Sequence, residues 1–240
     1  MSKATIVVTT RNRSAVLKRT LDSILFQNTG VPVVVVDDDS SDDTEQVCQS
    51  YTLRYIKSRR PSRFGKTWEG VRNPGHVMNI GIRAVDTPII ILQSDDVIHQ
   101  KGAINALCQL APRTANIATV LGCDNELRPS REITGPNAKS LRFCLGAIHV
   151  KHFYAVGGCD EEFIYYGHED AWMAACLQYG QKIQPVFRED AIGYHIDHPI
   201  SWNEAEASIT RLQYDIRNAQ ATAGLIPWCS SGGPWEQKDD

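Results

Sequence analysis

The sequence predicts an α/β protein in which a Rossmann-like, mostly parallel sheet is flanked by helices in a single domain. Strand and helix signals alternate along the first hundred residues, as in a doubly wound sheet. The run Val33–Val36 is apolar at every position and ends in Asp37, Asp38 and Asp39, as expected of an inner strand buried on both faces. No Pro/Gly/Ser-rich linker divides the 240 residues, which favours one large domain.

The elements of the first half follow from hydrophobic periodicity. Apolar and β-branched segments predict four strands, at residues 4–9, 31–36, 53–56 and 88–92. Ser14 is expected to cap a helix that buries Leu17, Leu21, Ile24 and Leu25 on one face. Three further helices are predicted at residues 42–48, with Ser41 or Asp42 as the cap, at 76–85 and at 101–110.

In the second half, residues 125–139 carry two prolines and mixed charges, which predicts a loop over the site. Strands are expected at residues 143–150, 183–187 and 193–196. Helices are expected at residues 152–156, 169–179 and 203–221. The last dozen residues look frayed, and the tail from Glu236 to Asp240 is expected to be solvated.

Composition limits the classes of partner. The net charge is -3, which argues against stable binding to nucleic acid or to an anionic membrane. One local basic run is either a solvated loop or a loop that faces phosphate: Arg54, Lys57, Arg59, Arg60, Arg63 and Lys66. The seven scattered cysteines include no CxxC pair, and no apolar stretch is long enough to span a membrane. We therefore expect a cytoplasmic protein with reduced thiols and no transmembrane segment.

Several segments, in order and spacing, resemble the N-terminal half of family 2 glycosyltransferases: Ile6–Asn12, Leu21–Gln27, Val34–Thr44, Met78–Ala84 and Ile90–Asp96. Two later segments, Val156–Phe163 and Gly167–Asp170, are similar to the GGFDE and GxED motifs of that family and of galactosyltransferase-like relatives. The resemblance covers roughly residues 4–198.

This resemblance implies a type A glycosyltransferase fold that transfers a sugar, with inversion, from a nucleotide-sugar to an acceptor hydroxyl. A UDP-sugar is the expected donor, and the acceptor is a glycan or another hydroxyl-bearing molecule. Residues 1–110 would bind the nucleotide-sugar, residues 111–225 would bind the acceptor and carry catalysis, and residues 226–240 would form a C-terminal tail.

The resemblance also assigns donor-binding residues: Thr9, Arg11, Asp38, Arg72, Asn79, Gln93 and Asp95. Thr9 and Arg11 fall on the loop that holds the nucleoside, and the Asp38 carboxylate can accept hydrogen bonds from uracil. Turn formation and helix capping are the alternative for Asp37–Asp39. Met78 stands where the family often has arginine, so Arg72 or the basic run is expected to supply that cation.

Asp95 and Asp96 occupy the position of the family's metal-binding acidic motif, with Gln93 in place of its first acid. Carboxylate oxygens suit Mn²⁺ or Mg²⁺, the expected cofactor. His195 lies where galactosyltransferase-like relatives place a metal-binding histidine, and His198 is the alternative ligand. Capping of a following helix is the competing role for the two aspartates.

Glu169 and Asp170 are the candidates for catalysis. By their place in the motif, Asp170 would take the proton of the acceptor hydroxyl, and Glu169 would hold acceptor or donor hydroxyls. An acidic pair at the start of a helix is also favoured by the helix dipole alone. Neighbouring aromatic side chains that could stack on sugar rings favour catalysis: Tyr165, Tyr166, His168 and Trp172.

Two other functions compete with this one. A haloacid-dehalogenase-like phosphatase is suggested by a hydrophobic strand followed by Asp37-x-Asp39 and by the later Ser94-Asp95-Asp96, but it leaves the segments around Glu169 and His195 unexplained. A catalytically silent nucleotide-sugar-binding protein is suggested by Gln93 and Met78.

Overall fold

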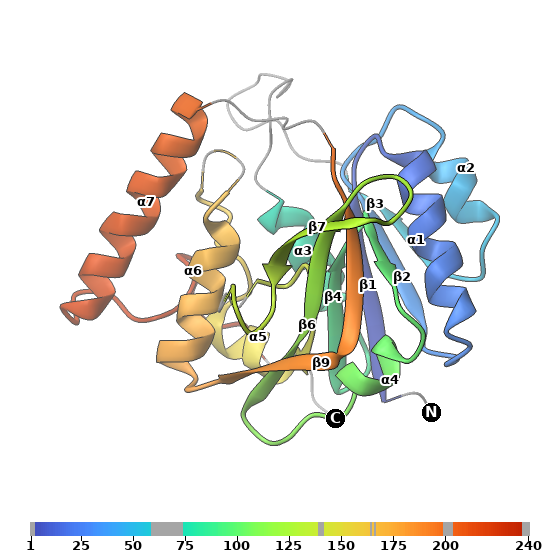
Figure 1. Ribbon diagram of the computed structural model, residues 1–240. Coiled ribbons are helices and arrows are strands. Elements are labelled where there is room, and N and C mark those ends of the chain that lie inside the picture. Colours follow the sequence, from blue (N-terminus) through green and yellow to red (C-terminus); the bar gives the residue numbers. More distant parts are fainter. Residues whose placement is uncertain are drawn as a thin grey trace.

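The computed structural model describes residues 3–58, 74–138, 142–163, 165, 167–198 and 204–236. The strands of this part of the chain are β1 (Ala4–Thr10), β2 (Val33–Asp37), β3 (Arg54–Lys57), β4 (Ile89–Ser94), β5 (Val97–His99), β6 (Thr114–Cys123), β7 (Pro129–Thr134), β8 (Leu145–His149) and β9 (Gln184–Ile196). Its helices are α1 (Ser14–Phe26), α2 (Thr44–Gln49), α3 (Gly75–Arg83), α4 (Ala103–Leu107), α5 (Lys151–Val156), α6 (Glu169–Ala175) and α7 (Glu204–Thr222), with a π-helical turn at Cys176–Gly180. The strands form one sheet in the order β3-β2-β1-β4-β8-β6-β9-β5, and β7 pairs with β6 (Figure 1).

The first half of the chain forms the parallel part of the sheet. Strand β1 lies between β2 and β4 and is parallel to both, and β2 is parallel to β3. Successive side chains of a strand point to opposite faces. Accordingly, Val7 packs in the core that contains Val77 of α3, whereas Ile6 and Val8 pack in the core that contains Leu17 of α1. Both faces are covered, which confirms the predicted α/β fold.

The second half extends the same sheet instead of forming one of its own. Strand β8 pairs antiparallel with β4, and β6 pairs antiparallel with β8 and parallel with β9. Helices α5 and α6 cover the face that α3 also covers, and α7 lies beside α6 (Figure 1). The two halves therefore share one sheet, as a single domain requires.

The strands of the second half differ from the prediction. Residues 125–139 are not wholly a loop, because β7 pairs with β6, and β6 itself is not among the predicted elements. Pro129 is compatible with β7 because it stands at the first position of a strand that lies off the main order of the sheet. Residues 184–196 form one strand, although its pairing with β6 skips residues 189–191, which lie between the two predicted strands.

The start of α1 also differs from the prediction. Ser14 is the first residue of the helix, not its cap, and its backbone N–H donates to the Asp42 carboxylate at 2.9 Å. Asp42 accepts a second hydrogen bond from the backbone N–H of Thr44 at 3.1 Å, so one carboxylate serves the first residues of α1 and α2. Leu25 is 58% exposed and does not join the buried face of α1.

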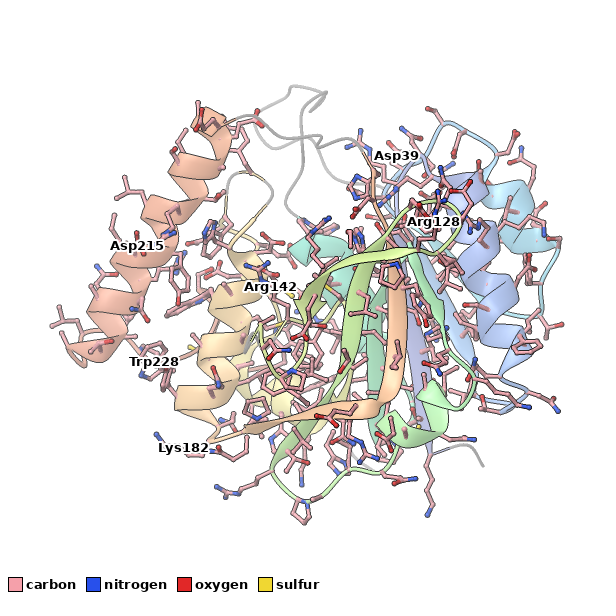
Figure 2. The ribbon with its side chains drawn as sticks, in the orientation of Figure 1. Asp39, Arg128, Arg142, Lys182, Asp215 and Trp228 are labelled. Carbon is pink, nitrogen blue, oxygen red and sulfur yellow. The ribbon has the colours of Figure 1, made fainter. Side chains whose placement is uncertain are left out.

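The C-terminal segment is packed, so the prediction of fraying over residues 229–236 is wrong. Ser230 is buried, and the backbone N–H of Trp235 donates to the Tyr154 carbonyl oxygen at 2.8 Å. Just before this segment lies Trp228, which is labelled in Figure 2. Its ring stacks on that of Trp172 of α6, with ring centroids 5.6 Å apart. Large aromatic side chains offset the entropy of ordering such a segment, because each removes a large apolar area from water.

Among the helices that the structure describes, none has both the length and the apolar character needed to cross a membrane.

Candidate functional site

The polar residues that follow β1, β2 and β4 meet at one edge of the sheet. Thr9 pairs with Val36 on one side and with Ser94 on the other. Parallel strands place their carboxyl ends together, and this edge is where open α/β sheets bind ligands. The residues that follow β2 and β4 therefore lie on either side of the end of β1, at the edge that their sequence positions predict.

The aspartates after β2 have different surroundings. The Asp37 carboxylate is buried and accepts hydrogen bonds from the backbone N–H of Ser40 at 2.9 Å and from the Tyr55 hydroxyl at 2.6 Å. Asp37 thus stabilises the turn and anchors β3. Asp38 is also buried, and its backbone N–H donates to the Thr10 carbonyl oxygen at 2.9 Å. Asp39 is exposed and has a left-handed backbone, with φ of 60°.

Arg13, which the sequence patterns do not single out, binds both aspartates after β4. Its Nη1 donates to Asp95 Oδ1 at 2.9 Å and to Asp96 Oδ2 at 2.8 Å. The Thr10 hydroxyl donates to Asp95 Oδ2 at 2.6 Å, and the Thr20 hydroxyl donates to the Asp95 carbonyl oxygen at 2.7 Å. Residues at the end of β1 and in α1 therefore fix the turn that carries the two acids.

The pKa values of the two buried acids, Asp95 and Asp96, are shifted in opposite directions. Burial and the neighbouring Asp96 charge raise the pKa of Asp95 to about 7, although Arg13 and Thr10 oppose this shift. Burial acts in the same direction on Asp96, but the hydrogen bond from His198 and the charges of His195 and Arg13 outweigh it and lower the pKa of Asp96. Asp96 is therefore the acid of the pair that carries its charge near neutral pH.

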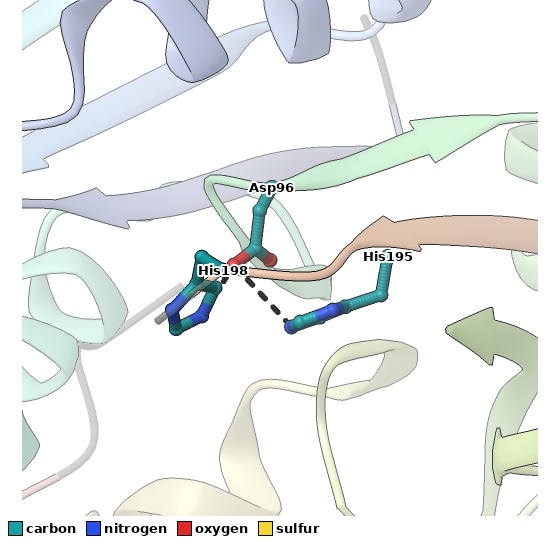
Figure 3. Close-up of side chains that lie close together, drawn as sticks. All are labelled: Asp96, His195 and His198. Atoms are coloured by element: carbon teal, nitrogen blue, oxygen red, sulfur yellow. Dashed lines mark ion pairs between the residues drawn. The ribbon is translucent and has the colours of Figure 1, made fainter. Parts of the chain in front are cut away.

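Asp96, His195 and His198 form a group that could hold a metal ion (Figure 3). Asp96 Oδ2 lies 3.3 Å from His195 Nε2 and 3.4 Å from His198 Nε2. The pairing of β5 with β9 sets this geometry, because Val97 lies opposite His195. Asp95, a predicted metal ligand, lies outside the group.

The metal-binding atoms that Asp96, His195 and His198 offer fit a divalent cation. One carboxylate and two imidazoles are ligands that Mn²⁺ and related ions accept. Asp96 Oδ1 is buried and has no hydrogen-bond partner among the described residues, so that oxygen has a lone pair to offer. Burial lowers the pKa of His195 despite the nearby Asp96 charge, which favours the neutral imidazole that a metal requires.

The second acidic pair begins α6. Glu169 is 2% exposed and accepts a hydrogen bond from the backbone N–H of Gly167 at 2.7 Å. Burial and the neighbouring Asp170 charge raise the pKa of Glu169 to about 8. The Asp170 side chain is 31% exposed and lies 3.9 Å from Arg142 Nε. The pair thus combines a buried, protonated acid with an accessible carboxylate.

A short segment before β8 joins the two acidic pairs. The Cys144 carbonyl oxygen accepts a hydrogen bond from the backbone N–H of Ser94 at 3.0 Å. Burial raises the pKa of the Cys144 thiol to about 12, and the charges of Asp170 and Asp96 both contribute. Cys144 therefore lies near the charges of both Asp96 and Asp170.

The other predicted donor-binding residues lie on several different elements. Asn79 is buried in α3, where its side chain bonds the backbone N–H and carbonyl oxygen of Cys159 and the carboxylate of Glu161, at 2.7–2.9 Å. Gln93 is buried in β4, and Arg11 follows β1 and is partly exposed. Arg72 lies outside the described residues, as do Tyr166 and the basic side chains between residues 59 and 66.

His168, which precedes the second acidic pair, has an unusual backbone. Its φ is 67°, in the left-handed region that favours glycine. Its ring lies 5.9 Å from that of Tyr214 in α7. This strained residue directly precedes Glu169 and Asp170, the first two residues of α6.

Solved structures with the same architecture bind nucleotides. A mannosyltransferase, PcManGT from Pyrobaculum calidifontis, determined in complex with GDP-Man and Mn²⁺, superposes with a TM-score of 0.63 at 18% identity and covers 92% of this chain. S. aureus TarS residues 1–349 in complex with UDP-GlcNAc gives a TM-score of 0.63 at 16% identity over 83% of this chain. The chain spans 64% of the mannosyltransferase and 60% of that TarS chain.

At these identities the solved structures show that the chain has the type A glycosyltransferase fold. A sequence comparison with curated proteins gives no match. Residues 5–157, by contrast, match the family model described as glycosyl transferase family 2. Because this match extends over more than half of the 240 residues, the chain belongs to glycosyl transferase family 2.

Proposed function

We propose that this protein is a metal-dependent, inverting glycosyltransferase that moves a sugar from a nucleotide-sugar, with a UDP-sugar as the donor, to an acceptor hydroxyl. The observation that carries the proposal is the group of Asp96, His195 and His198 at the carboxyl ends of the strands, in a chain of glycosyl transferase family 2. Residues 1–110 would bind the donor, and residues 111–225 would bind the acceptor and carry catalysis.

Asp96, His195 and His198 would hold Mn²⁺ or Mg²⁺, and the imidazoles favour Mn²⁺, since Mg²⁺ prefers oxygen ligands. When bound, the cation would neutralise charge on the diphosphate leaving group. The mannosyltransferase with the same fold was determined with Mn²⁺. Asp95 would act beside this group, held by Arg13 and Thr10.

Donor recognition is assigned to the other residues at this edge of the sheet. Asp38 would accept hydrogen bonds from the base, and Thr9 and Arg11 would line the nucleoside. Gln93 would bond the ribose. Asn79, which holds the Cys159 loop, would act by keeping α3 in place beside the donor. The solved structures of the same fold carry GDP-Man, UDP or UDP-GlcNAc, and we favour uridine for this chain.

Asp170 and Glu169 would divide the acceptor chemistry. Inversion needs one base that removes the proton of the acceptor hydroxyl while its oxygen attacks the anomeric carbon. Asp170 is accessible enough to contact the acceptor. Glu169, which keeps its proton to about pH 8, would donate a hydrogen bond to a sugar hydroxyl. The phosphatase alternative is less well supported, because Asp37, the first acid of its motif, is buried and hydrogen-bonded to Ser40 and Tyr55.

A thermal-unfolding panel tests this proposal. UDP, GDP and several nucleotide-sugars are added with and without Mn²⁺, and a ligand at a hundred times its Kd stabilises by about 2.7 kcal/mol, or roughly 5–10 °C for a domain of this size. We expect the largest shift with a uridine nucleotide plus Mn²⁺, and its loss in Asp96→Asn and His195→Ala. His149→Ala is the control, because His149 lies opposite Ile89 at the far end of β4.

Two outcomes would contradict the proposal. If no nucleotide shifts the unfolding temperature, the protein has no donor site. If uridine nucleotides bind but Mn²⁺-dependent hydrolysis of a UDP-sugar is absent in the wild type, the protein is a silent binder.

Asp170→Asn should lose sugar transfer while keeping the UDP-induced shift in unfolding temperature, which separates catalysis from binding.

A further inference from the structure

Arg13 and the two histidines of the candidate cation site face the same oxygen atom of Asp96. Asp96 Oδ2 accepts from Arg13 Nη1 at 2.8 Å and is also the atom that faces His195 Nε2 and His198 Nε2. Any cation that takes Asp96 Oδ2 as a ligand therefore shares it with a guanidinium group. Two positive groups on one oxygen repel each other, and the repulsion is strong where water is excluded. Asp96 is 1% exposed, so screening by solvent is weak here.

The guanidinium is held firmly in this position. Nη1 donates to both Asp95 and Asp96, and the Arg13 side chain is 26% exposed. Asp95 is fixed in turn by the Thr10 and Thr20 hydroxyls. Arginine stays protonated in proteins, so a pH change does not release it. Arg13 thus acts as a built-in positive charge between the two acids.

We propose that Arg13 is a positioning residue that competes with the free cation for Asp96, so that the cation is taken up tightly only together with an anionic diphosphate. The inference rests on the proposed function. An anion that binds the cation brings negative charge to the site, which offsets the repulsion between the cation and the guanidinium. Arg13 thereby couples the two ligands, and the coupling is reciprocal: each ligand tightens the other by the same factor.

The test is the Mn²⁺ dissociation constant, measured by electron paramagnetic resonance of free Mn²⁺ with and without saturating UDP. In the absence of UDP, Arg13→Met and Arg13→Gln should bind Mn²⁺ at least about tenfold more tightly than the wild type. Arg13→Lys should remain weak because it keeps the charge. UDP should tighten Mn²⁺ binding more in the wild type than in Arg13→Met. The control Arg211→Met removes an equal charge from an exposed ion pair with Asp215 on α7 and should leave Mn²⁺ binding unchanged.

The outcomes separate this inference from the function on which it rests. If the wild type binds Mn²⁺ in the presence of UDP but the two uncharged variants bind Mn²⁺ no more tightly without UDP, competition by Arg13 is refuted and the cation site stands. Failure of both variants to fold would make Arg13 a structural anchor and would also overturn the inference. If neither the wild type nor Arg13→Met binds Mn²⁺ even with UDP, the cation site itself is wrong.

Discussion

Glu169 shows how burial can reverse the usual behaviour of a carboxyl group. Its ordinary pKa lies near 4.5, but burial and the Asp170 charge raise it to about 8 in the folded protein. Between these two values the folded state keeps a proton that the unfolded state has released. By linkage, the free energy of unfolding therefore falls as the pH rises from about 4.5 to 8 and is constant with respect to this group above that range.

The variant Glu169→Gln should remove this pH dependence, because the amide does not titrate. We expect the stability of Glu169→Gln relative to the wild type to increase between pH 5 and pH 8, with a slope of up to about 1.4 kcal/mol per pH unit. Urea denaturation at four pH values measures it. Glu189→Gln, a change at an exposed carboxylate of β9, is the control. Parallel curves for Glu169→Gln and the wild type would contradict the raised pKa.

Residue types in the sequence predict which acids gather, but not which contacts they make. The positions of Asp37–Asp39 and Asp95–Asp96 after strands are sufficient to place them at one edge of the sheet. The division of roles between Asp37 and Asp38 depends on Tyr55, a neighbour from another strand. The sequence does not identify Arg13 for a similar reason. An arginine in a loop indicates no particular role until the fold places two buried carboxylates next to it. Its only signal in the sequence is its place two residues after Arg11.

At the scale of elements, helix α3 packs close to the sheet because Gly81 has no side chain. A Cβ atom on Gly81 would overlap the Val7 side chain of β1 and would approach Val36 Cγ2 of β2 to 3.3 Å. The glycine thus allows the helix to approach both strands. Asn79, two residues earlier, binds the loop at Cys159 from the same helix. Close packing at Gly81 and the hydrogen bonds of Asn79 together fix the position of α3.

The substitution Gly81→Ala should therefore destabilise the protein, although alanine favours helices by about 1 kcal/mol over glycine. Overpacking in a close-packed core costs about 1–3 kcal/mol, so we expect a net loss of up to about 2 kcal/mol. Chemical denaturation provides the measurement. Gly232→Ala is matched to it because a Cβ atom at Gly232 meets nothing within 4 Å. Equal stability of the two variants would show that α3 can shift without cost.

Element prediction succeeded where the periodicity was strong and failed where pairing decides the structure. The apolar runs of β1, β2 and β4 identify buried strands without knowledge of their partners. In contrast, five of the six residues of β7 are at least partly exposed, and among the described strands it pairs with β6 alone. Such a strand has little apolar pattern to detect. Glu189 and Asp190 interrupt the pattern of β9 where its pairing with β6 is interrupted, so two strands were predicted in place of one.

At the scale of the whole molecule, the C-terminal segment binds elements from both halves. Trp235 packs edge-on against Tyr154 of α5, with ring centroids 5.4 Å apart, and Arg83 of α3 lies 3.8 Å above its ring. The Ser230 hydroxyl donates to the Gly157 carbonyl oxygen at 2.8 Å. The segment therefore clamps α3 and α5, which lie on the same face of the sheet.

The substitution Trp235→Ala should cost about 2 kcal/mol, from lost apolar burial and the lost cation–π contact with Arg83. The Trp235 backbone hydrogen bond to Tyr154 remains in this variant. The change in unfolding temperature measures the effect. Leu225→Ala is the control because Leu225 is 75% exposed. An unfolding temperature equal to that of the wild type would mean that the Trp235 side chain contributes nothing to the stability of the domain.

The pairing of β5 with the end of β9 bears on the stage of folding at which the cation site forms. Asp96 and His195 are about a hundred residues apart in the chain, and the two strands that align them meet only when a long loop of the polypeptide closes. Contacts of such high sequence separation usually form late. A cation held there would thus act on the native state more than on the path towards it, and would slow unfolding more than it speeds folding. Metal binding would then report that β5 and β9 have paired in the native fold.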